Sequence, residues 1–268
     1  MTMVYRNQMN IFLKLLSNNL YLLIMKCLII FAGESFRMGG QYSRNIGSDE
    51  SFQPQYKAAE SHIKFINSLI KKEITYDLFI NTYETPFYND LIKWYSNLNS
   101  FYIKNDHNIK NNLQNLFNEV LNIKRNTLDS YDFILCARID MCFKDYFIEQ
   151  FNPLWEKIMF PSICFIPYHT TINNEPRVND TMIFIPKKLF SVIPNFNINH
   201  YSWYNYKKYC NMTNDNLDLI LSTYHDSDTA KDWNPLYYLV GRNMKDESEW
   251  VCKNYSIDKV NFTHVINN

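Results

Sequence analysis

Residues 131–143 read YDFILCARIDMCF and decide the fold. A short apolar run that stops at alternating charge is typical of a buried strand in a parallel sheet. Arg138 and Asp140 follow the run two residues apart, so their side chains should face the same side. Ligands of α/β sheets bind beyond the carboxyl ends of the strands. The stretch therefore predicts an α/β sheet with a charged pair facing a crevice.

The preceding chain predicts a strand, loop, helix and strand unit. Residues 27–33 (CLIIFAG) form an apolar run ended by glycine, and residues 76–83 (YDLFINTY) form another. Between them, residues 55–72 place apolar side chains at helical spacing and lysines at the end that favours positive charge. Such a unit builds a parallel sheet.

The later chain predicts further strands and a late helix. Residues 158–170 and 181–190 read as strands whose prolines confine them to strand ends or edges. Residues 217–242 read as a helix, a polar loop and a last aromatic helix or strand. We expect one α/β domain over residues 25–268, with a mixed, mainly parallel, Rossmann-like sheet flanked by helices.

The amino-acid composition limits which kinds of partner the protein is expected to bind. Lysine plus arginine and aspartate plus glutamate each number 27 in 268 residues, so no whole-protein field favours nucleic acid or an anionic membrane. The six cysteines lack metal-site spacing, and three lie in apolar runs. Buried, reduced thiols and a cytoplasmic location are expected.

The amino terminus has two interpretations. Residues 11–32 are apolar enough to suggest a signal anchor, but Lys14, Lys26 and the pair Asn18 and Asn19 interrupt the run. We expect residues 1–24 to be an extension of the domain, without membrane association.

The loop after the first predicted strand is a candidate phosphate site. Four of the chain's five glycines, together with Arg37 and Arg44, lie within residues 33–54. Backbone N–H groups and a guanidinium suit a nucleotide phosphate. The loop has neither the P-loop GK[ST] sequence nor the GxGxxG fingerprint, so both of those classes are excluded.

Arg138 and Asp140 are the strongest chemical candidates. Glycosyl transfer from a nucleotide sugar needs its departing diphosphate neutralised, by arginine or by a divalent cation on a carboxylate. An ordinary salt bridge at a strand end is the alternative.

Asn179 and Asp180 precede a predicted strand that should enter the same sheet. A carboxylate there could deprotonate an acceptor hydroxyl, as a general base does. A turn or a strand-start cap is the alternative.

A third group follows in residues 224–242. A histidine among carboxylates could complete a manganese or magnesium site. A solvated loop that caps a helix is the alternative. The candidates in this stretch are His225, Asp226, Asp228, Asn234 and Arg242.

Four segments in order resemble a diffuse family of GT-A-type glycosyltransferase-like proteins of large DNA viruses, microbes and algae. They are FAGESFR (31–37), YDLFINTY (76–83), YDFILCARIDMCF (131–143) and VNDTMIFIP (178–186). The resemblance covers residues 25–242. One departure is that Arg138-Ile139-Asp140 stands where the family has an Asp-x-Asp element, which puts strict metal dependence in doubt.

The resemblance implies a GT-A-like fold and a hexosyl- or deoxyhexosyltransferase that moves a sugar from a nucleotide-sugar donor to a glycan or glycoprotein. By it, Gly33 and Arg37 line the nucleotide site, Arg138 and Asp140 face the diphosphate or its metal, and Asp180 is the base. A Mn²⁺ or Mg²⁺ ion would be held by Asp140, and His225 of the third candidate group is the further expected ligand. In a virus, the reaction would take place in the host cytoplasm. A catalytically inactive nucleotide-sugar-binding or scaffold protein is the main alternative, and a nucleotidyltransferase is another.

Overall fold

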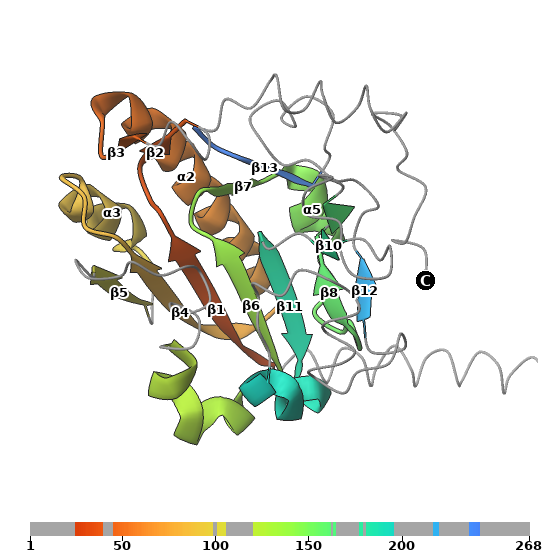
Figure 1. Ribbon diagram of the computed structural model, residues 1–268. Coiled ribbons are helices and arrows are strands. Elements are labelled where there is room, and N and C mark those ends of the chain that lie inside the picture. The colour runs from red at the N-terminus through yellow and green to blue at the C-terminus, as the bar shows by residue number, and fades with distance from the viewer. Residues whose placement is uncertain are drawn as a thin grey trace, which may run out of the picture.

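A seven-stranded sheet forms the centre of the molecule (Figure 1). The computed structural model describes residues 25–39, 45–98, 101–105, 120–161, 163–164, 177–178, 181–195, 217–219 and 236–241. The strands lie in the order β12 (Leu217–Leu219), β8 (Ile158–Phe160), β11 (Met182–Pro186), β6 (Phe133–Arg138), β1 (Lys26–Gly33), β4 (Thr75–Thr82) and β5 (Phe101–Asn105).

Six of these strands run in one direction. Only β11 is reversed, pairing antiparallel with both β6 and β8, while the other neighbours pair in parallel. The mixed, mainly parallel sheet predicted from the apolar runs is therefore confirmed.

The strand order reverses between β1 and β6. From β1 the chain passes to β4 and β5 on one side, then returns to place β6 on the other side of β1. In open α/β sheets, ligands bind outside the carboxyl ends of the strands at such a switch point. The fold alone therefore marks the carboxyl ends of β1 and β6 as the place to look for a site.

Helix α2 (Asp49–Lys71) precedes β4 in the chain and packs on one face of the sheet, behind β1 and β6 in Figure 1. Its buried side includes Phe65 and Leu69, as the helical spacing predicted. The predicted start at residue 55 is wrong, because the helix already begins at Asp49 and contains Pro54. The acidic first turn suits the positive end of the helix dipole, and the proline removes one hydrogen bond near the start without ending the helix.

The remaining elements are short. The helical ones are α3 (Tyr88–Tyr95), η1 (Arg125–Ser130), α5 (Asp145–Gln150) and η4 (Lys187–Asn195). Three two-stranded ladders join β2 (Arg37–Met38) to β3 (Asn45–Ile46), β7 (Met141–Phe143) to β13 (Tyr237–Leu239), and β9 (Ile163–Cys164) to β10 (Arg177–Val178).

The helix expected from residue 217 onward is wrong at its start. Residues 217–219 form β12, which pairs in parallel with β8 at the edge of the sheet. A short apolar run fits a strand or a helix equally well from its pattern alone, and here the open side of β8 decides. The last predicted element is the strand β13.

Two apolar clusters pack on the two faces of the sheet. One includes Phe31 and Phe65 on the α2 side, and the other includes Ile30 and Tyr131 on the opposite side. Cys27, Cys136 and Cys142 are buried free thiols, as predicted, and burial raises the pKa of the Cys142 thiol.

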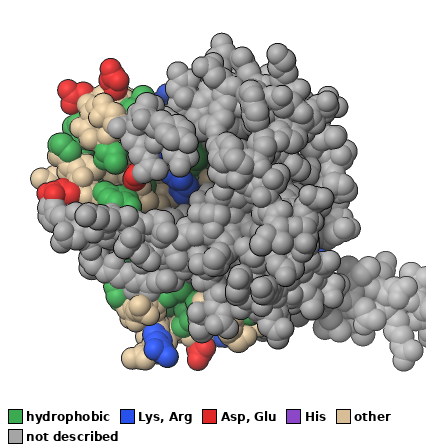
Figure 2. All heavy atoms as spheres, viewed as in Figure 1, with side chains coloured by type: hydrophobic (Ala, Val, Ile, Leu, Met, Phe, Trp, Pro, Cys, Tyr) green, Lys and Arg blue, Asp and Glu red, His purple; other side chains and the backbone are tan. Residues whose placement is uncertain are grey.

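Within the described part of the chain, no helix is both long and apolar enough to cross a membrane. Acidic and basic side chains are interspersed with hydrophobic ones on the described surface in Figure 2. This mixture agrees with a net charge of zero, so binding of an anion must depend on a local site.

Candidate functional site

The carboxyl ends of three adjacent strands meet at the switch point. Gly33, Thr82 and Arg138 are the last residues of β1, β4 and β6. Gly33 pairs with Thr82, and Arg138 pairs with Ala32. We call these strand ends, with the loop 34–38 and the turn 139–140, the carboxyl edge.

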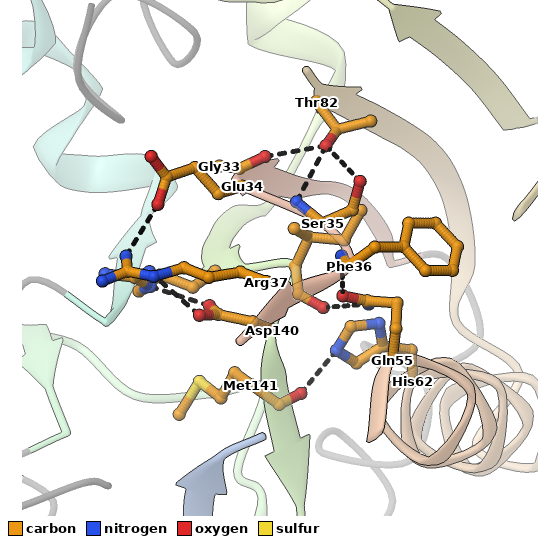
Figure 3. Close-up of polar contacts among 12 residues, drawn as sticks. Gly33, Glu34, Ser35, Phe36, Arg37, Gln55, His62, Thr82, Asp140 and Met141 are labelled. Atoms are coloured by element: carbon orange, nitrogen blue, oxygen red, sulfur yellow. Dashed lines mark hydrogen bonds and ion pairs between the residues drawn. The ribbon is translucent and has the colours of Figure 1, made fainter. Parts of the chain in front are cut away.

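Thr82 fixes the start of the loop after β1 (Figure 3). Its hydroxyl accepts the Ser35 N–H at 3.1 Å and lies 2.8 Å from the Gly33 carbonyl, to which it donates. Ser35 Oγ lies 2.7 Å from the same Thr82 oxygen. Phe36 then adopts a left-handed φ of 51°, an uncommon conformation for a bulky residue. The hydrogen bonds to Thr82 thus fix the backbone conformation at the start of the loop.

Aromatic packing holds Phe36 in this conformation. Its ring is fully buried against Phe52, Phe87 and Trp94. Backbone strain of this kind persists only where the surroundings fix it, and it is frequent at functional sites.

Gln55 ties this loop to the turn after β6. Its side-chain oxygen accepts the Phe36 N–H at 3.0 Å, and its amide nitrogen donates to the Ile139 carbonyl at 2.8 Å. Both bonds are buried, and the residue comes from α2 (Figure 3). One side chain therefore sets the spacing of the two segments that carry the arginines.

Arg37 lies at the end of the strained loop and is 4% exposed. Its Nη1 donates to Glu34 Oε2 at 2.7 Å, an ion pair between residues three apart (Figure 3). The carboxylate orients the guanidinium and keeps its charge compensated within the loop.

Arg138 and Asp140 form a second pair on the neighbouring strand. Nε and Nη2 of Arg138 donate to the two oxygens of Asp140 at 2.8 and 3.0 Å. Asp140 is 1% exposed and Arg138 is 15% exposed. The prediction that both side chains face the same side is confirmed, and the two-pronged geometry fixes the plane of the guanidinium.

The segment after β13 contacts the backbone beside both pairs. The Gly39 N–H donates to the Gly241 carbonyl and the Val240 N–H donates to the Asp140 carbonyl, each at 2.8 Å. Gly241 has a φ of 71°, and a Cβ there would lie 2.2 Å from the Arg37 carbonyl oxygen. Only glycine fits this approach.

His62 is a buried residue of α2 that hydrogen-bonds the strand following the Arg138–Asp140 turn. Its Nε2 donates to the Met141 carbonyl and its Nδ1 accepts from the Tyr95 hydroxyl, both at 2.7 Å. The ring stacks on Phe31 at 3.8 Å. Burial lowers the pKa of His62 to about 3, so the ring is neutral and holds β7 in place.

The predicted donor-site residues Gly33, Arg37, Arg138 and Asp140 all lie at the carboxyl edge. Asp180 is followed by Thr181, which receives the Arg138 N–H at its carbonyl at 2.8 Å. The remaining predicted site residues lie outside the described residues; they are Asn179, Asp180, His225, Asp226, Asp228, Asn234 and Arg242.

The described residues alone do not fit a divalent cation. Among them, no three histidine, cysteine or carboxylate side chains come together. Both oxygens of Asp140 already accept hydrogen bonds from Arg138, so a cation at Asp140 would compete with the guanidinium. His225, the second predicted ligand, is not among the residues described.

Glu34, Gln55 and Gly241 are site residues that sequence reasoning missed. Gln55 carried a signal, since it lies on the helix face that buries Ala58 and His62. Glu34 and Gly241 carried none, because their partners are set by the loop shape and by chain segments far apart.

Comparison with known proteins gives structural neighbours only. No family model and no curated protein matches the sequence. A complex of Drosophila beta-1,4-galactosyltransferase 7 with manganese, UDP-Gal and xylobiose has 10% identity and a TM-score of 0.40, over 81% of this chain and 71% of its own. The 4-diphosphocytidyl-2C-methyl-D-erythritol synthase of Anaerococcus prevotii has 10% identity and a TM-score of 0.47, over 87% of this chain and 96% of its own.

A glycosyltransferase involved in glycosylation of the major capsid of PBCV-1 has 9% identity and a TM-score of 0.39, over 84% of this chain and 98% of its own. What this chain does therefore has to be inferred from its own residues.

Proposed function

We propose that the protein is a glycosyltransferase that moves a sugar from a nucleotide-sugar donor to a glycan or protein acceptor. One observation carries the proposal: Arg37, which is buried, and Arg138, which is 15% exposed, lie at the switch point of an α/β sheet, each oriented by its own carboxylate. Oriented guanidinium groups at a switch point suit a diphosphate. The resemblance of four ordered segments to GT-A-type proteins extends this from binding to sugar transfer.

In the proposed reaction, the donor diphosphate lies on the two guanidinium groups. The acceptor hydroxyl oxygen attacks the anomeric carbon, and the bond from that carbon to the diphosphate breaks. Arg37 and Arg138 stabilise the negative charge that grows on the departing diphosphate. Asp180 takes the proton of the acceptor hydroxyl as general base.

The donor is proposed to carry a hexose or deoxyhexose, and the reaction is proposed to take place in the cytoplasm, of a host cell if the protein is viral. Arg138 engages the carboxylate that the resemblance assigns to Mn²⁺ or Mg²⁺. We therefore assign neutralisation of the diphosphate to the arginines and no step to a metal ion.

The test is a thermal-shift and hydrolysis screen of the full chain against UDP-, GDP-, dTDP- and CMP-sugars, with manganese and with EDTA. Stabilisation by one donor, with slow release of its nucleotide in EDTA, is the expected result. Stabilisation without turnover on any acceptor would favour an inactive binding protein. No stabilisation by any donor would contradict the proposal.

A further inference from the structure

Thr181 carries a buried hydroxyl without a hydrogen-bond partner. The residue is 1% exposed, and its Oγ1 is among the buried polar atoms of the described residues that have none. Buried hydroxyls in native proteins are normally bonded, because leaving one unbonded costs stability. Such an atom is therefore expected where function needs it.

The position of Thr181 is set by the β6–β11 ladder. Met182 pairs with Ala137, so Thr181 lies opposite Arg138, whose N–H it accepts at 2.8 Å. Met182 and Ala137 both pack in the cluster on the α2 side. Successive side chains alternate between faces, so Thr181 and Arg138 project together from the other face.

Thr82 and Ser35, on the other side of the switch point, have satisfied hydroxyls. Thr82 and Ser35 hydrogen-bond to each other at 2.7 Å, and Thr82 also binds the loop backbone. Thr181 lies on the far side of Arg138 from this loop, since β1, β6 and β11 are consecutive in the sheet. The unbonded hydroxyl is thus beside Arg138 and away from the glycine loop that follows β1.

We infer that the Thr181 hydroxyl hydrogen-bonds a hydroxyl group of the transferred sugar. The inference rests on the proposed function. With the nucleotide at the glycine loop and the diphosphate on Arg37 and Arg138, the next group of the donor reaches β11. A sugar ring supplies the hydroxyls that a buried threonine can recognise, and a pocket built to bond a hydroxyl discriminates against ligands without one.

The experiment compares Thr181→Val, which keeps the shape and removes the hydroxyl, with Thr181→Ser, which keeps the hydroxyl. The probes are UDP-glucose, UDP-galactose, GDP-mannose, GDP-fucose and dTDP-rhamnose, each beside its nucleoside diphosphate. For the nucleotide sugar that binds wild type, T181V should lose about tenfold in affinity and keep its affinity for the nucleoside diphosphate within twofold. T181S should bind like wild type.

Stability distinguishes this role from a structural one. Removing an unbonded buried hydroxyl should leave the Tm of T181V equal to or above that of wild type. Thr75→Val is the control at the opposite end of the sheet, where the hydroxyl donates to the Met25 carbonyl at 3.2 Å, and it should not affect binding.

Three results would overturn the inference: unchanged nucleotide-sugar affinity in T181V, equal loss of both ligands, or a lower Tm of the kind a lost structural bond produces. Failure of wild type to bind any probe would instead contradict the proposed function. Equal binding by wild type and T181V would leave that function standing.

Discussion

The two ends of the central sheet both hold ion pairs, but the pairs at the two ends differ in the sequence separation of their partners. At the amino end, Asp77 Oδ2 forms ion pairs with Lys26 Nζ at 3.2 Å and Lys124 Nζ at 3.1 Å. It also accepts a hydrogen bond from the Tyr131 hydroxyl. These partners come from chain segments far from Asp77. At the carboxyl edge, Glu34 pairs with Arg37 and Arg138 with Asp140, within three residues of each other.

We infer from this difference that the ion pairs at the amino end stabilise the fold, whereas those at the carboxyl edge orient a charged side chain. Long-range pairs at the amino end tie β1, β4 and the segment before β6 together, so their loss loosens the sheet. Local pairs at the carboxyl edge tie a loop or turn to itself, which contributes less to the fold and mainly fixes the direction of a guanidinium. At these two ends of the sheet, the long-range pairs therefore serve the fold and the local pairs orient an arginine.

The largest expected effect follows from Asp140→Asn. The substitution removes the charge that orients Arg138, so transfer should fall by about 10²–10³, the cost of losing one transition-state donor. Steady-state transfer rates with the donor found in the screen measure it. A rate like that of wild type would show that the pair is only a structural salt bridge.

Asp180→Ala tests whether Asp180 is the general base of the proposed transfer reaction. Loss of a general base should lower kcat by about 10² and leave donor affinity unchanged. Single-turnover transfer and donor titration on the same sample separate the two effects. A kcat within a few-fold of wild type would make Asp180 a turn residue.

Asp77→Asn makes the opposite change at the amino end. Burial alone would raise the pKa of Asp77, but hydrogen bonds from Tyr131, Lys124 and Lys26 lower it, so the carboxylate is stabilised as the anion. Its replacement should cost about 1–3 kcal/mol in the free energy of unfolding. Urea unfolding measures the loss, and kcat should be unchanged. A large loss of kcat with unchanged stability would contradict the claim that the ion pairs at the amino end serve the fold alone.

The last expected effect concerns pH. The pKa of His62 falls to about 3 in the folded protein, below its ordinary 6.5. The unfolded chain therefore binds a proton first as pH falls, and stability is full above pH 6.5 and declines toward pH 3. This one group contributes a slope of about 1.4 kcal/mol per pH unit.

His62→Gln can keep both hydrogen bonds without titrating. The free energy of unfolding should then fall less between pH 6.5 and pH 5 than it does in wild type. Equal slopes in the two proteins would show that another group sets the acid limit.

Much of the sheet could be predicted from sequence because its strands are buried on both faces and read as apolar runs. The start of α2 and the strand β12 could not, because Pro54 resembled a helix boundary and the run at Leu217 has no pattern that separates strand from helix. Tertiary contacts decide such short segments.

The arginines of the site could be predicted because a strand end and a glycine loop mark their positions. Their support could not. Gln55 and Gly241 act through contacts between residues far apart in sequence, and no local pattern records that an amide on α2 spans from Phe36 to Ile139. The unbonded state of the Thr181 hydroxyl is likewise visible only after the ladder is assembled.

The most direct test of the central claim is the affinity for the donor's nucleoside diphosphate, measured calorimetrically in EDTA for wild type and Arg138→Gln. If the carboxyl edge binds the diphosphate through guanidinium groups, wild type will bind without a metal ion and R138Q at least tenfold more weakly. Equal affinity of the two proteins, or binding by wild type only with manganese, would contradict the account.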